Sequence, residues 1–186
     1  MKKLCLAFVV LIMSLFQLKA QPFEYGDNVL NIGIGLAPVG YGYTYAGYSP
    51  GLEASFEHGF FEKLGIGYIS IGGYAGFRRA TYDWVWDNYS ITQTIVAARG
   101  AYHFDFLDLS GEDIFEKFDV YAGVLMGLRF ETADYDDDIV EFDNSTSGVF
   151  DTFIGGRYYF SENFGAYSEI SYAGISYFTV GLSFKF

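Results

Sequence analysis

Apolar and polar residues alternate at every second position over much of this chain, most clearly in residues 177–186. A strand presents its two faces at period two, so this segment has one apolar and one polar face. The apolar positions are Phe178, Val180, Leu182, Phe184 and Phe186. An outward row of such residues suits a wall that faces lipid.

Seven further segments alternate in the same way and are separated by turn residues, which is the pattern of a membrane barrel. The eight predicted strands cover 29–37, 52–59, 64–77, 91–104, 119–130, 149–160, 165–172 and 177–186. In 64–77 the alternation fits no single register, which predicts a bulge. The sequence therefore predicts an all-β fold, an eight-stranded antiparallel up-and-down transmembrane β-barrel.

The beginning of the chain has the pattern of a secretory signal peptide. Lys2 and Lys3 precede an apolar run over 4–18, and Ala20 offers a small residue for cleavage. We expect a cleaved signal peptide over 1–20 and an outer-membrane barrel domain over 21–186. After the signal, no apolar stretch reaches the ~18 residues of a transmembrane helix.

The chain is acidic, with 11 basic and 23 acidic residues and a net charge of −12. Removing Lys2, Lys3 and Lys19 with the signal leaves eight basic residues against 23 acidic ones. This balance argues against nucleic acid as a partner, because the phosphate backbone would be repelled. The single cysteine, Cys5, lies in the signal, so the exported chain relies on no disulfide.

Three stretches carry a family resemblance: 119–123 (DVYAG), 155–160 (GGRYYF) and the closing 161–186. They resemble the small eight-stranded outer-membrane β-barrel domain family, near the OmpX/OmpW-type proteins. The resemblance implies the outer membrane of a Gram-negative bacterium, with lipids including lipopolysaccharide around the wall. It also implies that the barrel assembly machinery reads Phe186 as an assembly signal. It concerns architecture and says little about activity.

An even strand count and a periplasmic amino terminus assign the connectors to two sides. Those expected outside the cell are 38–51, 78–90, 131–148 and 173–176, and those expected in the periplasm are 60–63, 105–117 and 161–163. The connector 105–117 is long for a periplasmic turn, and the sequence offers no reason for its length.

Side chains fill the interior of an eight-stranded barrel. The strand registers place four basic and four acidic residues inside, so the lumen is close to neutral. Paired buried charges persist where unpaired ones are costly, which favours a structural salt-bridge plug. A polar path for protons or small ions is the alternative. The eight residues are Glu53, Glu57, Arg99, Arg129, Asp151, Arg157, Glu169 and Lys185.

The expected outer loops offer a possible interaction surface. Aromatic residues alternate in 82–86, which predicts that two strands continue past the membrane as a hairpin, and paired arginines suit lipid phosphates. The acidic run from 134 resembles the start of a calcium loop, but Ile139 stands where that loop needs glycine. A solvated acidic loop and weak divalent-ion binding both stay open. The surface comprises Arg78, Arg79, Tyr82, Trp84, Trp86, Asp134, Asp136 and Asp138.

Catalytic chemistry has little support in the sequence. The chain has two histidines, His58 and His103, both expected at periplasmic strand ends, and neither has a serine and an acid at recognisable spacing. We interpret them as interface or turn residues and expect no enzyme, cofactor or resident metal. The leading hypothesis is a structural anchor whose loops contact an unknown extracellular protein or glycan. A narrow channel for small or hydrophobic solutes is the alternative, and a lipid-modifying enzyme comes third.

Overall fold

The computed structural model describes residues 23–38, 46–83, 88–135 and 144–186, so the predicted signal peptide lies outside the described residues. The strands are β1 (Asn28–Pro38), β2 (Ala46–Tyr48), β3 (Gly51–Gly59), β4 (Gly67–Asp83), β5 (Asn88–Phe104), β6 (Phe118–Tyr135), β7 (Asn144–Ser161), β8 (Phe164–Ser171) and β9 (Ser176–Lys185). Between β5 and β6 lie the helix α2 (Phe106–Ser110) and the 3₁₀ helix η1 (Asp113–Lys117). No helix among the described residues is long and apolar enough to cross a membrane.

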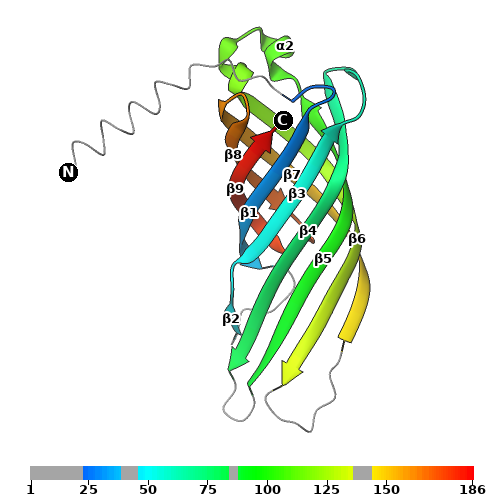
Figure 1. The fold of residues 1–186 in the computed structure, drawn as a ribbon, viewed down its shortest axis with the longest axis vertical. Helices are drawn as coiled ribbons and strands as arrows, with labels where there is room; N and C mark the ends of the chain where they lie inside the picture. Colours follow the sequence, from blue (N-terminus) through cyan, green and yellow to red (C-terminus); the bar gives the residue numbers. More distant parts are fainter. Residues whose placement is uncertain (1–22, 39–45, 84–87, 136–143) are drawn as a thin grey trace, which may run out of the picture.

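Eight antiparallel strands close into a barrel, which confirms the predicted fold (Figure 1). The sheet runs β4-β3-β1-β9-β8-β7-β6-β5, and pairing of β4 with β5 closes it. The short strand β2 pairs with β4 beyond the start of β3, where Ser49 and Pro50 interrupt the chain. Because proline cannot donate a backbone hydrogen bond, this break separates β2 from β3.

The two ends of the barrel differ in length and content. The C-terminus and α2 lie at one end, named here the terminal end, and the opposite end is named the loop end (Figure 1). Strands β4 to β7 have 17 or 18 residues each, whereas β8 has 8 and β3 has 9. About 9–11 residues suffice to cross a membrane. The long strands therefore project past the short ones at the loop end, including the predicted hairpin of β4 and β5.

The outer wall is apolar, and the inner face carries the polar and charged side chains. Large outward residues include Ile32, Phe56, Val96, Met126, Phe150 and Leu182. Near the terminal end, aromatic rings form a chain of contacts through Phe118, Tyr158, Phe160, Phe164 and Phe184. This distribution fits a lipid belt that ends in an aromatic girdle.

Strand β4 begins three residues later than predicted. Leu64 donates its backbone N–H to Gly67 at 2.8 Å, and Gly65 between them has φ +64°, a left-handed conformation that suits glycine. This turn contains the residues that broke the alternation. The predicted bulge is wrong, because β4 pairs in continuous register with both β3 and β5. The register shift lies instead between Tyr159 and Ser161 of β7, where it pairs with β8.

The long connector 105–117 is folded and capped. The Asp105 carboxylate accepts a hydrogen bond from the backbone N–H of Asp108 and caps α2. The Lys63 ammonium bridges from the preceding turn to the carboxylates of Asp105 and Asp108, at 2.6 and 2.8 Å. The hydrogen bond to Asp105, followed by that to Asp108, raises the pKa of Lys63 above its ordinary value.

Candidate functional site

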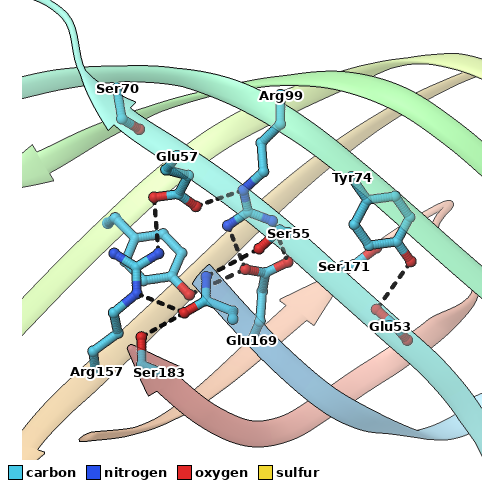
Figure 2. Close-up of polar contacts among 12 residues, drawn as sticks. Glu53, Ser55, Glu57, Ser70, Tyr74, Arg99, Arg157, Glu169, Ser171 and Ser183 are labelled. Carbon is cyan, nitrogen blue, oxygen red and sulfur yellow. Dashed lines mark hydrogen bonds and ion pairs between the residues drawn. The ribbon is translucent and has the colours of Figure 1, made fainter. Parts of the chain in front are cut away.

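A network of buried charges crosses the lumen in its terminal half, and Glu57 of β3 lies at its centre (Figure 2). One carboxylate oxygen of Glu57 accepts from Nε of Arg99 at 2.6 Å, and the other accepts from Nη2 of Arg157 at 2.8 Å. Glu57 therefore joins β5 and β7 across the interior, and both guanidinium groups share its carboxylate.

Each arginine has a second acidic partner. Arg99 makes a bidentate pair with Glu169 of β8, at 3.0 and 2.7 Å, and Arg157 donates to Asp119 of β6 at 2.6 Å. The Arg99 guanidinium lies 3.8 Å from the ring centre of Phe153, and that of Arg157 lies 4.2 Å from the ring centre of Tyr121. Bidentate and stacked geometry of this kind suits arginine and not lysine.

His103 belongs to this network, which corrects the prediction of an interface or turn histidine. Its Nδ1 lies 2.8 Å from Oδ1 of Asp119, and its Nε2 lies 2.9 Å from Oγ of Ser70 and 3.3 Å from Oε2 of Glu57. The ring of Phe23, from the segment before β1, stacks on the imidazole at 3.8 Å between centroids. Three carboxylates thus meet two guanidinium groups and one imidazole, and their charges balance when both ring nitrogens of His103 carry a proton.

Ser70, His103 and Asp119 have the connectivity of a hydrolytic triad but not its setting. Ser70 is 0 % exposed, and Phe23 covers the imidazole. Asp119 is shared with Arg157, and Glu57 competes with Ser70 for Nε2. A nucleophile needs a base able to accept its proton and space for a substrate carbonyl beside it. This arrangement supplies polar partners for buried groups and joins β4, β5 and β6.

In the loop half of the lumen, the chain itself enters the interior. The turn 172–175, between β8 and β9, folds inward and buries Ile175 completely against Tyr74, Ile95 and other members of the apolar cluster. The turn's backbone is held from both sides. Arg78 donates to the Ile175 carbonyl at 2.8 Å, and Arg129 donates to the Ala173 carbonyl at 2.6 Å.

Asp151 of β7 fixes the other side of this turn. Its Oδ1 accepts from the backbone N–H groups of Tyr172 and Ala173, at 2.9 and 2.7 Å, and its Oδ2 accepts from the Ser171 hydroxyl. The placement of Arg78 corrects the prediction that it meets lipid phosphates at the outer interface. Arg78 faces the lumen and is buried, since it shares the inward face of β4 with Ser70 and Tyr74.

The structure places all eight predicted lumen residues on the inner face, but it does not bring them into one cluster. Arg99, Arg157, Glu57 and Glu169 meet in the terminal half. Arg129 and Asp151 hold the loop-end turn, and Glu53 bonds separately to Tyr74. Lys185 lies near the terminal end, 3.5 Å from Asp27.

Sequence reasoning missed Asp119, His103, Asn31 and Phe23 as lumen residues. Asp119 lies ten positions from Arg129, and His103 lies four positions from Arg99. Because both spacings are even, strict alternation along β6 and β5 places both residues on the inward face. Asn31 lies on β1, where its side chain accepts from Arg157 at 3.2 Å. Phe23 precedes the first strand and has no periodic signal.

The predicted loop surface is only partly covered by the described residues. Arg79 faces outward and donates to the Ser90 hydroxyl at 2.7 Å. In the strand register, Tyr82 of β4 is opposite Tyr89 of β5, and Asp134 of β6 is opposite Ser90 of β5. Trp84, Trp86, Asp136 and Asp138 lie outside the described residues. Within the described ranges, no group of three or more His, Cys, Asp or Glu side chains is arranged to hold a metal ion.

The predicted assembly residue Phe186 lies at the seam where β9 meets β1. Its backbone N–H donates to the Asn28 carbonyl at 2.9 Å, and its carbonyl accepts from the Asn28 N–H at 3.1 Å. Its ring is exposed at the terminal end, next to the outward row of β9. The side chain is therefore available to a partner while its backbone closes the barrel.

A closed antiparallel barrel of eight strands, with an apolar outer belt and a polar filled lumen, is the fold of small transmembrane barrels of the outer membrane. No protein-family model matches the chain, and no curated protein matches its sequence.

Solved structures show the same fold. The N-terminal barrel of Pseudomonas aeruginosa OprF is 14% identical, with a TM-score of 0.51 over 88% of this chain and 100% of that one. OprG of the same organism is 11% identical, with a TM-score of 0.53 over 91% and 99%. Ail, the attachment invasion locus protein of Yersinia pestis, is 13% identical, with a TM-score of 0.50 over 87% and 99%.

Proposed function

We infer that this protein is a non-enzymatic anchor in the outer membrane, with its terminal end in the periplasm and its loop end outside the cell. Its role is to present the projecting strands and their loops to an extracellular partner. In both halves of the lumen, bonded side chains or the chain itself cross the interior among the described residues, which supports anchoring over transport.

One observation carries this proposal: the projecting sheet has one open edge. Strand β7 pairs with β8 only from Phe153 onward, so residues 144–151 have a partner strand only in β6 among the described residues. The opposite edge, on β4, is covered by β2. An unpaired edge at the outer surface is a template on which a second chain adds a strand.

The composition of the open edge favours a protein partner. Asn144 to Gly148 are exposed and uncharged, so main-chain hydrogen bonds would supply most of the affinity. Ail has been crystallised with sucrose octasulfate, a heparin analogue. A polyanion of that kind suits the present chain poorly, because its net charge is −12.

The test is to shorten the projecting hairpins without touching the barrel. Arg129 and Ser147 are directly opposite in the register, so an Asn-Gly turn can replace 130–146 and remove the exposed end of the open edge, and Asp83 and Asn88 allow the same replacement of 84–87. Cells displaying the intact protein should adhere to an extracellular-matrix coating, and cells with the first replacement should lose adhesion. Heat-shifted gel mobility serves as the folding control. Equal adhesion by folded, shortened barrels contradicts the proposal.

A narrow channel for hydrophobic solutes has one supporting observation. An open groove in the outer wall, lined by Ile154, Ile170, Tyr172 and Tyr177, reaches the lumen residues Phe153 and Ser171 where β8 ends. Planar-bilayer recording decides between the two functions. We expect no discrete conductance steps from the folded protein, whereas reproducible steps, or uptake of apolar solutes that is lost on blocking the groove, favour the channel.

A further inference from the structure

The terminal end of the barrel carries large apolar side chains that are exposed beyond the strands. Leu109 in α2 and Leu64 in the turn between β3 and β4 are 52 % and 58 % exposed. Ile32 and Phe150, on the wall that faces lipid, are exposed to a similar extent, 52 % and 62 %. The same turn carries further exposed apolar residues, which include Phe60, Phe61 and Ile66. These connectors are therefore as apolar on their surface as the wall of the barrel.

The turn 60–66 and the connector 105–117 are tied to each other, and together they are named here the terminal surface. Figure 1 shows α2, which belongs to this connector, at the terminal end past the strands. The backbone N–H of Asp105 donates to the Ile66 carbonyl at 2.9 Å, and the ion pairs of Lys63 reach from the turn to α2. The terminal surface is therefore one folded unit that involves both connectors.

A row of aromatic contacts continues the outer wall into the terminal surface. Tyr102 and Phe104 lie on the outward face of β5, since the alternate positions face the lumen. The ring of Phe104 lies 5.1 Å from that of Tyr102 and 6.0 Å from that of Phe106, between centroids. The Phe106 ring lies 5.8 Å from that of Phe115. Phe106 and Leu109 are three positions apart in α2 and share one face of that helix.

The short strand β3 fixes the depth of the terminal surface relative to the membrane. β3 has nine residues, which is the lower limit of the about 9–11 that a tilted strand needs to cross the hydrocarbon core. The core therefore extends to the end of β3 at Gly59, directly before Phe60. The Phe60 N–H donates to the Ile69 carbonyl at 3.1 Å, and Ile69 is opposite Tyr102 in the register. The aromatic row thus begins where the hydrocarbon core ends, and the terminal surface lies at the depth of the lipid headgroups.

From this geometry we propose that the terminal surface binds the adjoining leaflet of the membrane, with Phe61, Leu64 and Leu109 inserted among the headgroups of zwitterionic phospholipids. Burial of apolar side chains at the headgroup boundary supplies the attraction. Carboxylates on the polar side of the connector suit headgroups with an ammonium group, whereas net-anionic lipids would be repelled. The connector has five acidic residues and one basic residue: Asp105, Asp108, Glu112, Asp113 and Glu116 against Lys117.

The test is spin labelling of the chain refolded into mixed vesicles of phosphatidylcholine and phosphatidylethanolamine. A chain that begins at Gln21 contains no cysteine, so nitroxide labels can be placed singly at Leu64→Cys and Leu109→Cys. Their accessibility to oxygen relative to a water-soluble nickel chelate should exceed that of Glu162→Cys, in the polar turn at the same end, several-fold. Val124→Cys, on the outward face of β6, gives the value for the lipid belt. Labels that match Glu162→Cys, or that are shielded from both reagents, overturn the proposal.

The unmodified chain provides a second measurement that needs no variant. In nanodiscs of the same lipids, the amide protons of Leu64 and Leu109 should show cross-relaxation from lipid protons, and that of Glu162 should not. The absence of this signal at both leucines also overturns the proposal.

The headgroup preference has its own test. Exchanging phosphatidylethanolamine for phosphatidylglycerol should lower the oxygen-to-nickel ratio at Leu109→Cys, and an equal or higher ratio refutes the zwitterionic preference. These measurements concern the terminal end and the adhesion assay concerns the loop end, so either proposal can fail alone.

Discussion

The two halves of the lumen are closed by different means. In the terminal half, side chains from β3, β5, β6, β7 and β8 meet in a network of opposite charges. In the loop half, the backbone of the turn 172–175 enters the lumen, and charged side chains bind its carbonyl and N–H groups. The first arrangement depends on charge balance among distant strands. The second depends on one turn that supplies its own apolar filling.

This difference predicts how each half responds to substitution. Removing one member of a charged network lowers the free energy of unfolding strongly, because the remaining charges stay buried without a partner. Truncating an apolar side chain of a folded turn lowers it in proportion to the volume removed, because the backbone hydrogen bonds remain. The comparison is therefore tested by removing one residue from each half.

Glu57→Ala should have the largest effect. Both Arg99 and Arg157 lose a shared partner at 2.6 and 2.8 Å in a site without access to water. We expect a loss of about 3 to 5 kcal/mol in the free energy of unfolding. Urea unfolding in lipid vesicles, followed by gel mobility, measures it. Asp108→Asn at the exposed end of a surface pair is the control, and equal losses in the two variants contradict the network's role.

Ile175→Ala should lower the free energy of unfolding by less, about 2 kcal/mol, which is at the low end of the range for truncating a buried isoleucine. Gly51 and Gly76 adjoin the Ile175 side chain, so the neighbouring backbone has room to close on the cavity. The same unfolding assay measures the loss, with the exposed Ile114→Ala as a control. If the two halves are independent, the double variant with Glu57→Ala is additive within about 0.5 kcal/mol. A larger coupling shows that the lumen is one unit.

Phe23→Ala should act locally at the terminal end. Removing the ring that stacks on His103 lowers the free energy of local opening by about 1.5 kcal/mol, since that is the order of burying one phenyl side chain. Modification of His103 by diethyl pyrocarbonate should then quicken about tenfold. His58, which is bonded to Asn28 outside the network, provides the comparison within the same molecule. Parallel acceleration at both histidines indicates general loosening instead.

The smallest effect concerns Lys63, outside the lumen. Because the folded pKa of Lys63 lies above its unfolded value, its contribution is fully present below the unfolded pKa and is lost as pH rises through the folded one. Lys63→Met should cost about 0.5 kcal/mol at neutral pH, as exposed ion pairs do. The unfolding curves of the variant and the parent should converge only at strongly alkaline pH. Convergence near neutral pH would exclude this ion pair as the cause.

Period-two alternation predicts the strands and the inward faces because both depend on local geometry alone. Asp119 and His103 follow from the same alternation once Arg129 and Arg99 are placed inside. The inward turn 172–175 does not follow, because four residues carry no period and their direction depends on Arg78, Arg129 and Asp151. The insertion of Phe23 likewise depends on a cavity that several strands create together.

The strand ends were predicted less well where turn chemistry replaced alternation. The left-handed turn at Gly65 breaks the alternation at the start of 64–77. In the sequence alone, this break cannot be told from a β-bulge. The projecting ends of β6 and β7 are polar on both faces, so they lack the signal that marks a lipid-facing strand. Strand pairing across the sheet, rather than burial, holds these residues extended.

The seam between β1 and β9 has a kinetic consequence. Its hydrogen bonds join Asn28 to Phe186, residues 158 positions apart, whereas most other neighbours in the barrel are joined by hairpins. Contacts between residues so far apart in sequence form slowly, because the entropy of closing a long loop is lost before the hydrogen bonds form. Until that moment β1 and β9 are both open edges, able to pair with the wrong chain. Closure at this seam is therefore the step at which folding most needs assistance.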